Sequence, residues 1–273
     1  MGSIEISHHT DVGKKRNHNE DSFVVVPPWK EPALSCQACF FGVADGMGGH
    51  AAGEVASKLA IEGVLKWMAQ NQITSLSLSQ IENAFSEASC SIWSYAQEHQ
   101  EKKGMGTTLT GFLLHGTQAL LGHIGDSRCY LLRDGELRQL SRDHTLVGEQ
   151  IRLGKLTPED AKKHPMRHIL SRAMGVREFA EVDTLLLDLA PGDLLMMCTD
   201  GVYNSFPDER IAEILKTAQF PAIARQLVEE AVETSGDDNS TAVIVRIQEL
   251  PIVVPGRFTL GRLKGLWYDW FNS

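Results

Sequence analysis

The sequence has little cysteine, little proline and too little positive charge to belong to several common classes. It has 10 prolines in 273 residues and no low-complexity tract, so collagen-like repeats and long disorder are excluded. Lys and Arg number 26 against 35 Asp and Glu, giving a net charge of −9, which argues against a general nucleic-acid binder. The five cysteines form an odd set, which argues against a disulfide framework and favours a reducing compartment.

Long apolar runs are also lacking. No stretch approaches the roughly 18 uninterrupted apolar residues of a membrane span, since even 184–198 contains Asp188 and Asp193. The first ten residues contain Glu5 and two histidines, where a secretory signal would need a basic start and an apolar core. We therefore expect a cytoplasmic protein with no transmembrane span. Cys36 and Cys39 are the only cysteine pair at metal or redox spacing, and without a second pair we expect them to be structural.

Short β-rich runs predict strands, some of them joined by turns too short for a crossover helix. Such connections require antiparallel pairing. The predicted strands are 22–26, 38–44, 107–115, 118–125, 128–132, 182–187, 193–198 and 241–247.

Helical periodicity is equally clear between these strands. One helix is predicted over 79–103, opened by a capping box of Ser79 and Glu82, and another begins at Thr157 with Pro158 in its first turn. The other predicted helices are 51–70, 208–217 and 221–234. Long amphipathic helices inserted between antiparallel strands predict an α+β layered sandwich.

Four aspartates fall where predicted strands begin or end. Asp45, Asp126 and Asp200 follow apolar strands, and Asp238 precedes the last one. Asp-Gly is an ordinary turn dipeptide, and we assign Asp134-Gly135 to a hairpin turn. A carboxylate at the end of a buried strand needs a partner or a metal, and the nearest base to any of the four is Arg128.

Oxygen ligands without His or Cys favour Mg²⁺ or Mn²⁺ over Zn²⁺. Two such ions sharing a carboxylate would activate a water for attack on phosphorus, which makes a phosphate ester the expected substrate.

Six blocks of sequence resemble the metal-dependent type 2C serine/threonine protein phosphatases, in their compact bacterial form. Their order and spacing follow that family over about residues 5–247. The blocks are GKKRNHNEDSF at 13–23, ADGMGGH at 44–50, GMGTT at 104–108, GDSR at 125–128, CTDGV at 198–202 and DDNST at 237–241.

The resemblance implies a four-layer α-β-β-α sandwich of two antiparallel sheets flanked by helix pairs, with a small helical flap at about 143–175. Residues 1–250 would form the catalytic domain. The resemblance also assigns roles: Asp45 bridges two metals, Asp200 and Asp238 hold the first, Glu20, Asp21 and the Gly46 carbonyl serve the second, Asp126 joins Asp200 at a third, and Arg16 holds the substrate phosphate.

The implied reaction is single-step hydrolysis of phosphoserine and phosphothreonine by a metal-bridging water, with two or three Mn²⁺ or Mg²⁺ ions. No cysteine has the Cys-x5-Arg spacing of a cysteine-dependent phosphatase. Met47 stands where many eukaryotic relatives carry a His thought to protonate the leaving group. The general acid is therefore open between a metal-bound water and His50.

Two segments have alternative interpretations. The base-rich flap is either a solvated insertion or a surface for phosphorylated protein segments. The tail at 251–273, rich in aromatic and basic residues, either docks on the domain or contacts a partner or a membrane surface.

The resulting hypothesis is a monomeric phosphatase in signal transduction, acting on a bacterial Ser/Thr kinase and that kinase's substrates. The alternative is a non-catalytic module that senses a phosphoprotein or a ligand on the same fold, although every expected acidic position is filled. A third hypothesis, a phosphatase of anti-sigma-factor antagonists, is disfavoured by Arg16 together with Asn19-Glu20-Asp21.

Overall fold

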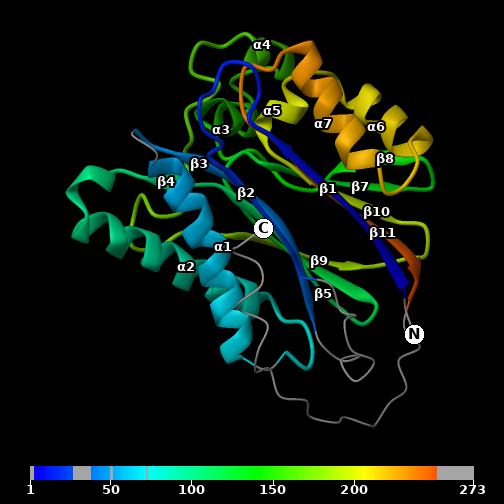
Figure 1. The fold of residues 1–273 in the computed structure, drawn as a ribbon, viewed down its shortest axis with the longest axis horizontal. Helices are drawn as coiled ribbons and strands as arrows, with labels where there is room; N and C mark the ends of the chain where they lie inside the picture. The colour runs from blue at the N-terminus through cyan, green and yellow to red at the C-terminus, as the bar shows by residue number, and fades with distance from the viewer. Residues whose placement is uncertain (1–2, 27–37, 50–51, 72, 251–273) are drawn as a thin grey trace.

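Two antiparallel sheets lie face to face, and helices cover the outer face of each (Figure 1). The structure is a computed structural model that describes residues 3–26, 38–49, 52–71 and 73–250. The first sheet has the order β1 (Ser3–Asp11), β11 (Ser240–Glu249), β10 (Leu194–Cys198), β7 (Arg128–Arg133) and β8 (Glu136–Gln139). The second has the order β2 (Asp21–Val26), β3 (Cys39–Met47), β5 (Leu109–His115), β6 (Gln118–Ile124) and β9 (Asp183–Asp188), and β4 (Gly106–Thr107) pairs with β3.

The helices form the two outer layers and a separate segment between β8 and β9. The second sheet is covered by α1 (Ala52–Gln70) and α2 (Leu78–Glu98), and a 3-10 helix, Gln100–Lys102, follows α2. The first sheet is covered by α5 (Asp200–Tyr203), α6 (Asp208–Thr217) and α7 (Ile223–Thr234). The segment between β8 and β9 carries α3 (Leu146–Arg152) and α4 (Pro158–Lys162). None of the described helices is long and apolar enough to cross a membrane.

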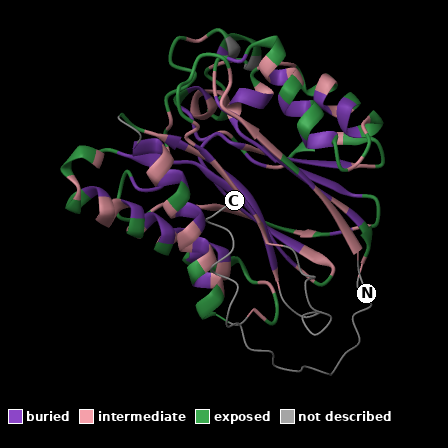
Figure 2. Cartoon of the chain, in the orientation of Figure 1, coloured by how far each residue is buried: buried purple, intermediate pink, exposed green. Residues whose placement is uncertain are grey.

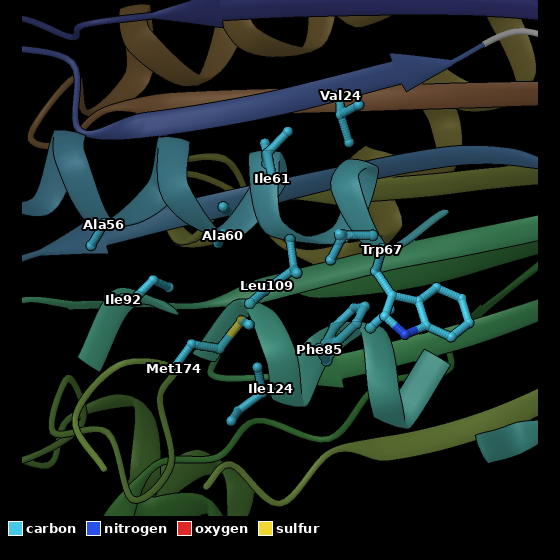
Figure 3. Packing of buried hydrophobic residues seen from close by; sticks show 14 of the residues in the cluster. Val24, Ala56, Ala60, Ile61, Trp67, Phe85, Ile92, Leu109, Ile124 and Met174 are labelled. Carbon is cyan, nitrogen blue, oxygen red and sulfur yellow. The ribbon is translucent and has the colours of Figure 1, made fainter. Parts of the chain in front are cut away.

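Three apolar cores hold the four layers together. One lies between the second sheet and α1 and α2, where Phe85 and Ile92 meet Leu109 and Ile124 (Figure 3). Another lies between the sheets, and the last lies between the first sheet and α6 and α7. Buried residues line both faces of the central strands and the inner faces of the helices (Figure 2). The expected α-β-β-α sandwich is therefore confirmed.

The side chains of β10 are all apolar, and they alternate between two of the apolar cores. Leu195 and Met197 pack between the sheets, whereas Leu194, Met196 and Cys198 pack against the helices. Successive side chains of a strand point to opposite faces, so a strand buried on both faces is apolar throughout. This burial fixes the position of Asp200 two residues later.

Strand β1 has no counterpart among the predicted strands. Its signal is weak because it lies at a sheet edge and mixes Ile4 and Ile6 with His8 and His9. Pairing with β11 along its whole length, rather than its own composition, makes it a strand.

The predicted start of α2 was wrong by two residues. The N-cap is Ser77, not Ser79, and Gln80 Oε1 accepts a hydrogen bond from Ser77 N at 2.9 Å. Ser-x-x-Gln and Ser-x-x-Glu are equally good capping boxes in sequence, so the choice came from packing.

Two local predictions are confirmed. Thr157 caps α4, since its Oγ1 accepts a hydrogen bond from Asp160 N at 3.2 Å, and Pro158 opens the helix. Asp134 and Gly135 form the tight turn between β7 and β8, with φ of 52° and 79°.

His50, Cys36 and the 251–273 tail lie outside the described residues.

Candidate active site

Five aspartates predicted from the sequence converge at one end of the two sheets. Asp21 begins β2 and lies directly opposite Asp45 of β3 in the strand register. The carboxylates of Asp21, Asp200, Asp126 and Asp238 all raise the pKa of Asp45, which burial also raises. Asp45 therefore lies among the other four, although the chain segments that carry them are far apart in the sequence.

Asp21 is held from one side only. Its Oδ2 accepts hydrogen bonds from Thr199 Oγ1 at 2.8 Å and from Thr241 Oγ1 at 2.7 Å. Its Oδ1 is buried with no hydrogen-bond partner. Burial, together with Asp200 and Asp238, raises the pKa of Asp21 to about 7 even though the two threonines lower it. An orphan oxygen of this kind is suited to a cation.

Asp200 also has an unpartnered oxygen, and Asp126 shares the raised pKa. Asp200 opens α5, and its Oδ2 accepts from Asn204 Nδ2 at 3.1 Å, but its Oδ1 is buried without a partner. Burial and the Asp238 carboxylate raise the pKa of Asp200 to about 6. Burial and the carboxylates of Asp200 and Asp143 raise the pKa of Asp126 to about 8.

The backbone around Asp45 is braced by hydroxyl groups. Thr108 Oγ1 accepts from Asp45 N at 2.8 Å, and Thr107 Oγ1 donates to the Asp45 carbonyl at 2.8 Å. Gly46 N donates to the Glu20 carbonyl at 3.2 Å, and the Gly53 amide donates to the Glu20 carboxylate. Burial nevertheless raises the pKa of Glu20. Glu20 and Gly46 thus lie together beside the start of α1.

Among the residues that the structure describes, the basic side chains near this cluster do not neutralise it. Arg16 Nη2 lies 2.7 Å from Asp238 Oδ2, and nearly half of the Arg16 side chain is exposed. Its partner is Asp238 rather than Glu20. Arg128, the nearest base in the sequence, forms an ion pair with Asp143, in which Arg128 Nη2 lies 2.7 Å from Asp143 Oδ2. The acidic cluster keeps an excess of negative charge.

The donor set fits hard divalent cations. Two buried carboxylate oxygens have no hydrogen-bond partner, and the neighbouring carboxylates hold one another's pKa values high. Within the described ranges, no three His, Cys, Asp or Glu side chains by themselves form a group that could hold an ion. Mg²⁺ and Mn²⁺ sites of this class take few protein ligands and keep several waters. We therefore expect carbonyl oxygens and waters to complete the coordination.

Three residues of the site were missed as functional residues by the sequence analysis. Thr199 and Thr241 bind Asp21, and Asn239 binds the loop that carries Arg16. All three lie inside the quoted sequence blocks. A polar residue next to a carboxylate is the signal that could have found Thr199 and Asn239, whereas Thr241 has no such neighbour.

The expected flap is present beside the cluster as two short helices, α3 and α4. Its base is fixed, since His144 N donates to the Gly125 carbonyl at 2.8 Å and Arg172 Nη1 lies 2.9 Å from Asp183 Oδ1. His168, between α4 and β9, is near enough to Asp238 for that carboxylate to raise its pKa, although burial and Arg167 lower it overall. His168 of the flap is thus within electrostatic reach of the Arg16–Asp238 pair.

Comparison with known proteins gives consistent similarities. Residues 14–239 match the family described as protein phosphatase 2C. The serine/threonine phosphatase stp of Listeria innocua is 37% identical over 243 residues, covering 86% of this chain and 93% of that protein.

The solved structures that are similar to this chain are also serine/threonine phosphatases. The Mycobacterium tuberculosis serine/threonine phosphatase PstP/Ppp superimposes with a TM-score of 0.80 at 34% identity, covering 91% of this chain and 100% of that one. The catalytic domain of PstP in complex with two manganese ions gives a TM-score of 0.78 at 33% identity, with the same coverage.

Proposed function

Since the chain belongs to the protein phosphatase 2C family and is a metal-dependent serine/threonine phosphatase of the bacterial type, we propose that its clustered aspartates hold the catalytic cations. The two relatives described above are catalytic phosphatases by name, which supports catalysis rather than a non-catalytic sensor. The observation that carries the proposal is the position of Asp45 among four other carboxylates, two of which have a buried oxygen without a partner.

Each acidic residue has a proposed place. Asp45 would serve two cations, Asp200 and Asp238 would hold the first, and Glu20 and Asp21 would serve the second with the Gly46 carbonyl. Asp126 and Asp200 hold a third ion where one binds. We propose Mn²⁺ or Mg²⁺, because all the ligands are oxygen atoms. The structure of the related PstP domain with two manganese ions supports this proposal.

Bound divalent cations lower the pKa of a water molecule and draw charge from the phosphoryl oxygens. Arg16 binds the phosphoryl oxygens through its planar guanidinium, and Asp238 holds that guanidinium at the cluster. Without cations, the carboxylates would repel the phosphate. Met47 has no proton to donate to the leaving group, so that proton comes from another donor.

We propose phosphoserine and phosphothreonine proteins as substrates, in particular a Ser/Thr kinase and the proteins it phosphorylates. Residues 1–250 would suffice for catalysis, as a monomer in the cytoplasm and in signal transduction. We assign the flap a role in substrate binding, because it carries basic residues such as Arg152, Lys155 and Arg167, and its His168 is within electrostatic reach of Asp238. These charges would favour a phosphorylated protein segment.

The test compares Asp-Gly pairs that look alike in sequence. Asp45→Asn and Asp200→Asn should each reduce phosphate release from a phosphothreonine peptide by at least a hundredfold at saturating Mn²⁺, because each removes a proposed cation ligand. Asp134→Asn is the matched control, since Asp134 also precedes a glycine but lies in the β7–β8 turn. Its rate should stay within twofold of the wild type. Near-normal rates in Asp45→Asn or Asp200→Asn would contradict the proposal.

A further inference from the structure

One buried amide ties the loop that carries Arg16 to the strand end that carries Asp238. Asn239 is 4% exposed and lies immediately before β11. Its Nδ2 donates to the Val12 carbonyl at 2.9 Å and to the His18 carbonyl at 3.0 Å. Its Oδ1 accepts from Glu20 N at 2.8 Å. A single side chain therefore satisfies three backbone groups along the 12–20 loop.

The loop runs beside the chain that leaves α7 (Figure 1). Lys14 N donates to the Gly236 carbonyl at 2.7 Å, and Lys15 Nζ lies 2.7 Å from Asp237 Oδ1. A Cβ added at Gly13 would lie 2.3 Å from the Asp238 carbonyl oxygen, so the two backbones are in close contact. The loop holds Arg16 at its centre and ends at Glu20.

The other side chains that contact the 12–20 loop hold it less completely than Asn239 does. Asn19 Nδ2 donates to Thr10 Oγ1 at 2.8 Å and Asn19 Oδ1 accepts from Asp21 N at 3.1 Å, so Asn19 braces only the end of the loop. The Lys15 ion pair is largely exposed and therefore weak. Asn239, in contrast, binds the start and the end of the loop from a buried position.

We propose that Asn239 is a positioning residue that sets the location of the Arg16 guanidinium relative to the acidic cluster. The inference rests on the proposed role of Arg16 in phosphate binding. Asn239 does not touch the substrate. It fixes the backbone on both sides of Arg16, while the adjacent Asp238 fixes the guanidinium itself.

Loss of the amide has a specific expected consequence. Asn239→Ala leaves two carbonyls and one backbone N–H without their protein partners, so the loop loosens around Arg16. Phosphate binding then weakens, because a displacement of about 1 Å at a binding group is enough to impair it. The carboxylates of Asp45 and Asp200 are on other elements and keep their places, and Glu20 keeps its hydrogen bonds from the Gly46 and Gly53 amides.

The experiment is a double-mutant cycle on the full chain, measured with a phosphothreonine peptide at saturating Mn²⁺. Asn239→Ala should raise KM about tenfold and change kcat less than threefold. Arg16→Ala should also raise KM. In the Arg16→Ala background, Asn239→Ala should add less than a twofold increase, because the group it positions is already gone.

Asn71→Ala is the control for general loss of stability. Asn71 Nδ2 donates to the Trp67 carbonyl at 2.8 Å at the end of α1, so this variant also loses a side-chain bond to the backbone. It should lower the unfolding temperature and leave KM unchanged. Asn239→Ser, which can satisfy only one of the two carbonyls, is the milder variant if the alanine protein does not fold. Its KM should be intermediate.

An unchanged KM in Asn239→Ala or Asn239→Ser, while Arg16→Ala raises KM, would overturn this inference alone. An equal KM increase from Asn239→Ala with and without Arg16 would also overturn it, because the effect would not pass through Arg16. An unchanged KM in Arg16→Ala would remove the phosphate-binding role of Arg16, and this inference with it. The assignment of the cation ligands would then still rest on Asp45 and Asp200.

Discussion

At the scale of the residue, the acidic cluster is unfavourable for the folded chain by itself. Burial and neighbouring carboxylates raise the pKa values of Asp21, Asp126 and Asp200 to about 7, 8 and 6. Each shift means that the fold disfavours the charged form of that side chain. The cost is offset only when cations, or protons, replace the missing partners.

The approach of β3 to α1 depends on a glycine at one position of the ADGMGGH block. A Cβ at Gly46 would lie 2.0 Å from the Gly53 carbonyl oxygen, which is backbone and cannot turn aside. Gly46→Ala should therefore lower the free energy of unfolding by about 2–4 kcal/mol and reduce activity more than tenfold. Urea unfolding and phosphopeptide hydrolysis measure the two effects.

Gly49→Ala is the control from the same block. A Cβ at Gly49 meets nothing within 4 Å. Stability and activity should both stay close to the wild type. Similar losses in the two variants would show that the block is sensitive to any substitution, against the steric argument.

His123 should make the protein less stable in mild acid. It is fully buried, with Thr110 Oγ1 2.8 Å from Nδ1 and the Arg142 carbonyl 2.8 Å from Nε2. Burial and then His144 lower the pKa of His123 to about 4 from 6.5. Its contribution is complete above pH 6.5 and falls as the pH drops towards 4, because the unfolded chain takes up the proton first.

The expected loss from His123 between pH 7 and pH 5 is about 2 kcal/mol. The aspartates with raised pKa values have the opposite effect, because they stabilise the folded chain as the pH falls. The effect of His123 is therefore measured as the difference in stability between the wild type and a variant that lacks this histidine. Urea midpoints of the wild type and His123→Gln, taken at pH 7 and pH 5 with the same Mn²⁺ concentration, isolate this group. Parallel pH profiles in the two proteins would contradict the assignment.

At the scale of the element, the helix pair α1 and α2 is set by one close crossing. A Cβ at Gly63 of α1 would lie 2.7 Å from the Cβ of Ala88 on α2. Small residues on both helices allow the backbones to approach, and Phe85 and Ile92 then reach the second sheet (Figure 3).

Ala88→Leu should push the two helices apart and lower the free energy of unfolding by about 2–3 kcal/mol. The crossing carries neither Arg16 nor any of the proposed cation ligands, so KM should change less than twofold. Gln97→Leu, on the exposed face of α2, is the matched control and should be nearly neutral. Chemical denaturation of the three proteins gives the comparison, and equal stability of Ala88→Leu and the wild type would contradict the close crossing.

At the scale of the whole molecule, the net charge of −9 is unevenly distributed. Arg16 and Arg128 are paired with Asp238 and Asp143, and the five clustered aspartates lie where two sheets meet. Cation binding at this end would therefore couple to the stability of both sheets, because β2 and β3 of the second sheet and α5, which follows β10 of the first, each supply a carboxylate.

Mn²⁺ should stabilise the folded protein by about 2.7 kcal/mol at a hundred times its Kd, a rise of roughly 5–10 °C in Tm. Asp45→Asn should lose most of this increase. In EDTA, however, Asp45→Asn should be at least as stable as the wild type, because it removes one of five crowded charges. A lower Tm for Asp45→Asn in both conditions would contradict the electrostatic account of the cluster.

Much of the architecture could be predicted from periodicity and turn chemistry. The 208–217 helix, the α4 cap at Thr157 and the Asp134-Gly135 turn each depend on residues close in the chain, and all are as predicted. Strand β1 and the start of α2 could not be predicted in this way. An edge strand of mixed polarity and a choice between Ser77 and Ser79 as the helix cap are both decided by tertiary pairing and packing.

The sequence by itself determined which residues can serve the chemistry: acidic residues at strand ends, Arg16 in a polar loop, and six blocks in a recognisable order. Only the tertiary structure decided which of them meet. It placed Asp21 opposite Asp45, paired Arg16 with Asp238 and bound the Arg16 loop through Asn239. The physical reason is range: propensity and patterning act over a few residues, whereas burying two sheets against each other brings together groups more than 200 residues apart.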